Sequence, residues 1–110
     1  MIQTIIHRQG DLITGFELTG HADSGEYGQD IVCAAASALS ITTTNALIAV
    51  AGVTPDVQSD SVNGGLLIVR VPVIDNDEQS LQAQTLLAAF ELGMKEIAKQ
   101  YSQYVNLKIN

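Results

Sequence analysis

Two stretches near the N-terminus alternate between apolar and polar residues with a period of two, which is typical of half-buried β-strands. The first covers residues 2–8 and the second covers residues 12–19. Turn residues fill the short segment 9–11 between them, so the two stretches are predicted to form a β-hairpin. One face of the second stretch is predicted to carry Leu12, Phe16 and Leu18, and the other face Ile13 and Glu17.

Two longer segments are predicted to be helices. The first runs from Ile31 to about Ala51, with Gly52 expected as its left-handed C-terminal residue. It is apolar nearly all the way round, so we expect it to be covered by the sheet and by either a second helix or a partner subunit. The second helix is capped by Asn76 or Asp77 and has one apolar face at helical spacing. That face consists of Ala83, Leu86, Leu87, Phe90, Met94, Ile97, Ala98 and Tyr101.

Three further strands complete the predicted fold. Residues 56–62 and 66–73 flank a turn at residues 63–65 and predict a second hairpin, in which Pro72 marks a strand end or a sheet edge. Residues 105–109 alternate again and predict a final strand. The order ββαββαβ predicts a single α+β domain over residues 1–110, with a mostly antiparallel sheet packed against two long helices.

Composition narrows the classes of function. The chain has 110 residues, of which 46% are hydrophobic and 15% charged, which agrees with one domain that has a real core. The net charge is −7 with only 5 lysines and arginines, which argues against direct nucleic-acid binding because few cations are present to neutralise phosphates. No signal peptide or membrane span is predicted, since threonines and Asn45 interrupt the apolar helix. The single cysteine predicts a reducing compartment, most simply the cytoplasm.

Segment 20–39 holds the residues with catalytic potential. Its first part, Gly20 to Gln29, contains three glycines and is predicted to be a flexible loop that carries His21. Asp30 follows as a favoured helix N-cap, which would put Cys33 at the third helical position. There the open N–H groups and the helix dipole would favour a thiolate. His21 could then serve as general base and later as general acid.

Each of these residues also has an ordinary structural interpretation. Cys33 could be a small core residue, because cysteine is among the most often buried residue types, and the nearby carboxylates oppose a second negative charge. His21 could be a surface residue, while Asp30 could be only a cap or could orient His21 and the loop. Ser37 lies one turn after Cys33 and could hydrogen-bond near the sulfur or back to its own helix. His7, in an alternating strand, is interpreted as structural or solvent-facing.

No metal or cofactor is expected. Two histidines, one cysteine and scattered carboxylates are too few and too dispersed for a zinc site. The sequence also has no GxGxxG segment, phosphate-binding loop or CxxC pair, the motifs that would indicate a nucleotide or redox cofactor.

Several motifs together resemble one protein family. They are Gly20-His21-Ala22, Tyr27-Gly28, Asp30-Ile31-Val32-Cys33-Ala34-Ala35, Ser37-Ala38 and the later turn Asn63-Gly64-Gly65. In this combination the chain resembles the ribosomal-processing cysteine protease family, called Prp, over nearly its whole length. The resemblance implies a cytoplasmic, homodimeric endopeptidase that removes a short N-terminal extension from the precursor of a large-subunit ribosomal protein.

The resemblance also implies roles for individual residues. Cys33 would be the nucleophile and His21 its base. Asp30 and Ser37 would support this dyad, and Gly20 would shape the loop that bears the histidine. The rest of the loop would act as a lid over the substrate peptide. Its residues are Ala22, Asp23, Ser24, Gly25, Glu26, Tyr27, Gly28 and Gln29.

Two other functions fit the same residues. One is a non-catalytic module that binds a ribosomal peptide and uses the glycine loop as a clamp. The other is a redox-sensing thiol, which needs the same activated sulfur but no base.

Overall fold

The structure is a computed structural model that describes residues 1–20, 27–60 and 65–110, with the backbone alone for residues 27–30. Within these residues the chain forms five strands and two helices in the order ββαββαβ. The elements are β1 (Ile2–Gln9), β2 (Leu12–Thr19), α1 (Tyr27–Ala49), β3 (Asp56–Asp60), β4 (Leu66–Arg70), α2 (Asp77–Gln100) and β5 (Val105–Ile109). This order confirms the predicted α+β fold.

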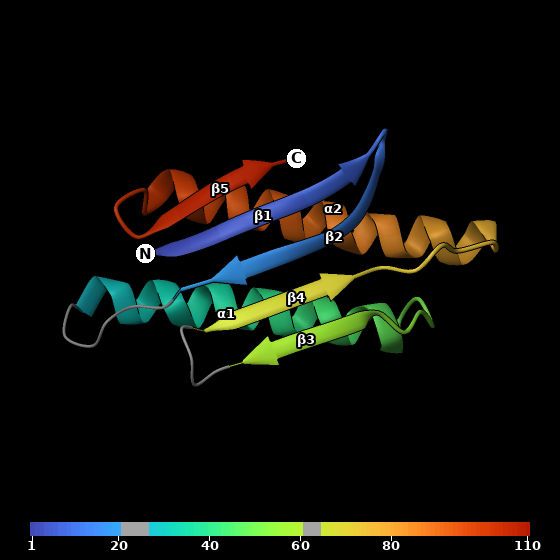
Figure 1. The fold of residues 1–110 in the computed structure, drawn as a ribbon, viewed down its shortest axis with the longest axis horizontal. Coiled ribbons are helices and arrows are strands. Elements are labelled where there is room, and N and C mark those ends of the chain that lie inside the picture. Colours follow the sequence, from blue (N-terminus) through green and yellow to red (C-terminus); the bar gives the residue numbers. More distant parts are fainter. Residues whose placement is uncertain (21–26, 61–64) are drawn as a thin grey trace.

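The five described strands form one sheet in the order β3-β4-β2-β1-β5. The pairs β1–β2, β2–β4 and β3–β4 are antiparallel, whereas β5 runs parallel to β1. Figure 1 shows both helices on the same face of the sheet, running in opposite directions. The sheet is therefore mostly antiparallel, as predicted, and the core lies between it and one layer of helices.

The second hairpin forms as predicted, with shorter strands. β3 pairs antiparallel with β4, and β4 ends at Arg70, so Pro72 lies beyond the end of the strand. Proline cannot donate a ladder hydrogen bond, which explains why pairing stops before it. Most of the turn predicted at residues 63–65, together with the last two residues of the predicted strand 56–62, lies outside the described residues.

A β-bulge corrects the predicted faces of β2. The pairing of β1 with β2 shifts between His7 and Arg8, which leaves Thr14 as an extra residue on β2. Ile13 is consequently buried and Leu12 is 51% exposed, so their predicted places are wrong. One extra residue reverses the alternation on one side of a bulge, because successive side chains point to opposite faces of a strand.

The side chain of Gln84 on α2 fixes the bulged part of β2. Its Oε1 accepts a hydrogen bond from the backbone N–H of Ile13 at 2.8 Å, and its Nε2 donates to the backbone oxygen of Ile13 at 3.0 Å. The amide thus replaces the two hydrogen bonds that a neighbouring strand would supply. This contact ties the hairpin to the helix layer.

α1 begins four residues before the predicted start. The helix includes residues 27–30, so Asp30 is not its N-cap and that prediction is wrong. A glycine inside a helix costs only about 1 kcal/mol, so Gly28 does not stop it. At the other end α1 stops at Ala49, and Gly52 has the expected left-handed backbone with φ of +66°. The N–H of Gly52 donates to the Ile48 carbonyl at 3.1 Å.

α1 is also long and apolar enough, over Ile31–Ala49, to cross a membrane by length and composition. Its side chains nevertheless take part in the core of the domain. Val32, Ala36 and Leu47 are buried in that core. One side of α1 therefore belongs to the core.

α2 is capped as predicted. The Oδ1 atom of Asn76 accepts a hydrogen bond from the N–H of Gln79 at 2.9 Å. The predicted apolar face is confirmed, with Ala83, Leu87, Phe90 and Met94 buried and the other members half-buried. Phe90 stacks on Phe16 of β2 with ring centroids 4.1 Å apart, which places the centre of the core between α2 and β2.

An ion cluster joins β1 to α2, with the buried Glu91 between the exposed side chains of Arg8 and Lys95. Arg8 donates to the carboxylate of Glu91 at 2.5 Å, and Lys95 lies 3.1 Å from the other carboxylate oxygen. Burial raises the pKa of the Glu91 carboxyl, but the hydrogen bonds and positive charges of Arg8 and Lys95 outweigh it and hold this pKa below its ordinary value of 4.5. Glu91 is therefore charged at neutral pH and holds the end of β1 on α2.

Candidate active site

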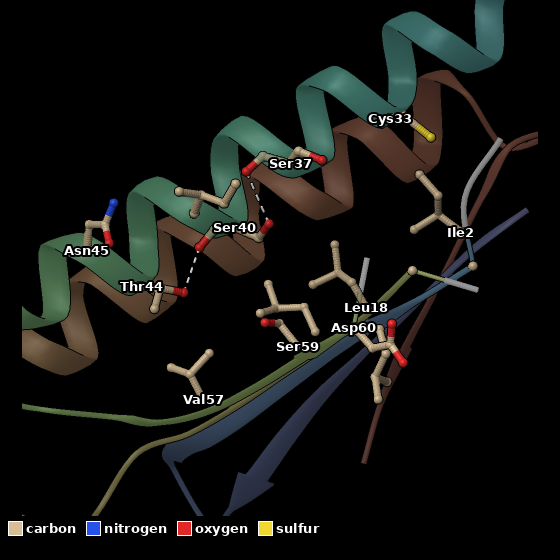
Figure 2. A pocket seen from close by; sticks show the side chains of 15 residues that line it. Ile2, Leu18, Cys33, Ser37, Ser40, Thr44, Asn45, Val57, Ser59 and Asp60 are labelled. Carbon is tan, nitrogen blue, oxygen red and sulfur yellow. Dashed lines mark hydrogen bonds between the residues drawn. The ribbon is translucent and has the colours of Figure 1, made fainter. Parts of the chain in front are cut away.

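A groove of about 520 Å³ lies between α1 and the strands β3 and β4. Figure 2 shows Cys33 at one end of it, beside Ile2, and Thr44 and Asn45 toward the other end. Val57 and Ser59 line the groove from the strand side. The groove therefore follows α1 for about three turns and starts at the cysteine.

Cys33 is half-buried, packs against the core on one side and lines the groove on the other. It is therefore not the fully buried core residue that its residue type favours. Its predicted position in the helix is wrong, because α1 starts at Tyr27 and Cys33 lies in the second turn. The influence of the helix terminus falls off within the first turn, so the open N–H groups there do not adjoin Cys33.

Gly20 brings the chain to the same end of the groove. It lines the groove together with Cys33 and has a φ of +81°. A Cβ atom at this position would lie 2.3 Å from the backbone oxygen of Met1, closer than any real contact. Only glycine therefore fits at this position, which lies between the end of β2 and His21.

His21 lies outside the described residues, so the Cys-His dyad stays a prediction. The same holds for Ala22, Asp23, Ser24, Gly25 and Glu26 of the predicted substrate loop. The other three members of that loop, Tyr27, Gly28 and Gln29, form the first residues of α1 instead. The loop prediction is wrong for these three residues, because the helix extends through them.

The structure places the side chain of Ser37 but not that of Asp30. Ser37 lies one helical turn after Cys33 and lines the same groove, and its carbonyl accepts a hydrogen bond from Ser40 Oγ at 3.2 Å. The backbone of Asp30 forms part of the first turn of α1, and its side chain is not among the parts that the structure describes. The structure thus brings Cys33, Ser37 and Gly20 to one groove, and leaves the supporting role of Asp30 as a prediction.

Most of the groove could not be found from the sequence. Its walls come from four strands and one helix that are far apart in the chain. Sequence reasoning missed Ile2, Leu18, Ser40, Thr44, Asn45, Val57, Ser59, Leu66 and Leu67. The one available signal was the spacing of Ser40 and Thr44, which continue the helix face of Cys33 and Ser37.

Asp60 is a titratable residue that also lines this groove, whereas His7 and Glu17 lie away from it. The Nε2 atom of His7 hydrogen-bonds to the Glu17 carboxylate, and the half-buried pair lies on the sheet face that no described helix covers. This placement fits the interpretation of His7 as a structural residue. In the described part of the chain, no three histidine, cysteine or acidic side chains gather closely enough to hold a metal ion.

Comparisons of the sequence point to one family. The family described as Cysteine protease Prp matches residues 1–106. A ribosomal processing cysteine protease Prp from Staphylococcus aureus is 39% identical over 95 residues, covering 86% of this chain and 85% of that protein. The Bacillus subtilis protein of the same description is 34% identical over 113 residues, covering 100% of this chain and 98% of that protein.

A solved structure agrees with the sequence comparisons. The crystal structure of an essential ribosomal processing protease Prp from S. aureus, in complex with a covalently linked product peptide, is similar to this structure with a TM-score of 0.84. The two chains are 35% identical, and the similarity covers 100% of each. The ββαββαβ arrangement is thus shared over the whole domain.

Proposed function

The chain belongs to the cysteine protease Prp family, and from this premise we propose that it removes the N-terminal extension of a large-subunit ribosomal protein precursor. One observation carries the proposal: the only cysteine of the sequence lies at the end of a groove and is accessible from it. In the S. aureus relative a product peptide is covalently linked. A covalent link between enzyme and peptide is what a nucleophilic mechanism forms as its intermediate.

In the proposed mechanism His21 takes the proton of the Cys33 thiol, and the Cys33 sulfur attacks the scissile carbonyl carbon. A C–S bond forms, the C–N bond breaks, and His21 gives the proton to the leaving amine. Water then attacks the acyl group as His21 takes a proton from it, the C–S bond breaks and the thiol is restored. Ser37, one turn along the groove wall, would donate a hydrogen bond to the oxyanion.

The groove suits the proposed substrate. A peptide extension reaches it as an extended chain, and the walls are mostly apolar, from Ile2, Leu18, Val57 and Leu67. The net charge of −7 favours the approach of a very basic ribosomal protein over that of nucleic acid. Of the substrate loop predicted at Ala22 to Gln29, the part that precedes α1 would complete the site as a lid over the bound peptide. A reducing compartment such as the cytoplasm would keep the Cys33 thiol available.

We also propose that the protein acts as a homodimer through its helix layer. Exposed residues recur along α1 at spacings of three and four, which is the pattern of a helix seam. They are Ile31, Ala34, Ala38, Ile41, Asn45 and Ile48, of which Ile41 and Asn45 also border the groove. On α2, Leu81 is 68% and Leu92 62% exposed. Sedimentation equilibrium should show a dimer that the double substitution Ile48→Glu and Leu92→Glu converts to a monomer.

The test of the proposed function uses the precursor of a large-subunit ribosomal protein. Incubated with the protein, it should lose its N-terminal extension, as mass spectrometry of both fragments would show. The Cys33→Ala variant should stay folded and leave the precursor intact. Full cleavage by folded Cys33→Ala, or no cleavage by the unchanged protein, would contradict the proposal.

A further inference from the structure

The α1 wall of the groove presents a line of hydroxyl groups that begins beside the nucleophile. Ser37, Ser40 and Thr44 follow Cys33 along the same side of the helix, four, seven and eleven residues further on. Figure 2 shows Ser40 and Thr44 on the side of α1 that faces the strands. Ser40 is only 2% exposed, so its hydroxyl lies deep in this wall.

The hydrogens of two of these hydroxyls are already used inside the helix. Ser40 Oγ donates to the Ser37 carbonyl at 3.2 Å, and Thr44 Oγ1 donates to the Ser40 carbonyl at 2.8 Å. A hydroxyl has one hydrogen and two lone pairs. Ser40 and Thr44 therefore face the groove as hydrogen-bond acceptors, and they suit a ligand that offers donors.

The spacing of these acceptors matches the main chain of an extended peptide. Ser40 and Thr44 are four residues apart, so they are separated by about 6 Å along the helix axis. In an extended chain the N–H groups that point to one side recur every second residue, about 6.6–6.8 Å apart. One extended peptide lying along α1 thus presents two N–H groups to the two hydroxyls.

The rest of the groove agrees with this orientation. Leu18, Val57 and Leu67 give it apolar contacts away from the hydroxyl line. A peptide whose N–H groups face α1 directs alternate side chains toward these apolar residues, because side chains stand perpendicular to the hydrogen-bonding direction. Main-chain recognition and side-chain recognition therefore use different walls.

We propose that Ser40 and Thr44 accept hydrogen bonds from two main-chain N–H groups, two residues apart, of the extended substrate peptide. The inference rests on the proposed function, since the peptide is its substrate. Hydrogen bonds to main-chain N–H groups do not depend on the identity of the peptide side chains. Selection among sequences is therefore left to the apolar contacts. Ser40 and Thr44 contact the substrate but take no part in bond breaking.

The first test compares two neighbouring threonines. Thr44→Val keeps the shape of the side chain and removes the acceptor. Thr43→Val is the matched control, because Thr43 makes the same kind of bond, to the Leu39 carbonyl at 2.7 Å, but is buried away from the groove. For a peptide that copies the extension, Thr44→Val should raise KM roughly three- to tenfold with kcat nearly unchanged, whereas Thr43→Val should leave both values unchanged. Equal kinetics of the two variants would overturn the inference.

The second test changes the substrate. Each amide except the scissile one is replaced in turn by an ester, which has no N–H. With the unchanged protein, two esters placed two residues apart should each raise KM by a similar factor. One of these penalties should vanish in Thr44→Val and the other in Ser40→Ala, because the acceptor is already gone. Ester penalties that persist unchanged in both variants would overturn the inference.

The same peptides also separate this inference from the proposed function. Their binding to the Cys33→Ala variant, followed by fluorescence anisotropy, repeats the comparison without any cleavage. If the unchanged protein fails to cut the all-amide peptide, the proposed function is wrong. The affinities of the ester-substituted peptides then still show whether Ser40 and Thr44 accept hydrogen bonds from the peptide main chain.

Discussion

The domain has two halves that use their apolar surface differently. In the α2 half, formed by β1, β2, β5 and α2, the helix packs closely on the strands, and Phe16 and Phe90 are almost completely buried. In the groove half, formed by β3, β4 and α1, Val57 remains 43% exposed although its partner across the strands, Val69, is buried. The first half buries its apolar area in the core, and the second keeps part of it open toward the groove in which we propose that the peptide binds.

Polar groups show the same contrast. In the α2 half they bond between elements, as Gln84 does with Ile13 and Arg8 with Glu91. In the groove half, among the described residues, Ser40 and Thr44 donate to carbonyls of their own helix. Bonds between elements fix the fold, whereas bonds within one helix leave lone pairs available to a ligand. Damage to the two halves should therefore appear in different measurements.

The largest effect is expected on activity, at the groove end. His21→Ala should lower kcat/KM for the precursor peptide by roughly 10²–10⁴-fold, because the base and acid of the reaction are lost. Denaturant unfolding should show nearly the same stability as before. His7→Ala is the control, since His7 lies on the other face of the sheet, and it should cleave normally. Normal cleavage by His21→Ala would show that His21 is not the base of the reaction.

The next effect is on stability and should distinguish the halves directly. Phe90→Ala should lower the free energy of unfolding by about 3–5 kcal/mol, because it removes a fully buried ring at the centre of the core. Val57→Ala in the groove half should lower it by less than about 1 kcal/mol, because Val57 is already 43% exposed. Urea unfolding of the two variants measures both values. Similar losses would mean that the groove half is packed as tightly as the other half.

A smaller effect is expected at the ion cluster and depends on pH. Arg8→Met should cost about 2 kcal/mol of unfolding free energy at pH 7, because it leaves the buried Glu91 carboxylate with Lys95 alone. The folded-state pKa of Glu91 is lowered, so its stabilisation is present above about pH 4.5 and is lost as pH falls through the lower folded value. The difference between variant and unchanged protein should therefore shrink below pH 4.5. A difference that stays constant with pH would contradict the ion-pair explanation.

The smallest effect should be a gain. Thr4 in β1 is buried, and its Oγ1 has no hydrogen-bond partner among the described residues. Thr4→Val keeps the shape and removes the unsatisfied hydroxyl, so it should raise the free energy of unfolding by about 1 kcal/mol. Thermal unfolding would show this as a higher Tm with unchanged peptide cleavage. A lower Tm would show that the hydroxyl has a partner in solution.

Much of this molecule was readable from local patterns in the sequence. Both hairpins, the apolar face of α2 and the Asn76 cap depend on residues close together in the chain, and the structure confirms them. The motifs around Cys33 likewise indicated the family, because most of their residues lie within the short segment 20–39. Local periodicity and spacing determined these features.

Other features depend on contacts between distant segments, and only the tertiary structure decided them. The bulge reverses the faces on which Leu12 and Ile13 lie. At the bulge, Ile13 is hydrogen-bonded by Gln84, which is 71 residues further along the chain. The start of α1 at Tyr27 contradicts the capping pattern at Asp30, because a cap is a local preference of about 1 kcal/mol that the rest of the fold overrides. The groove exists because α1 and β3 leave a space between them, and no single segment of the sequence encodes a space.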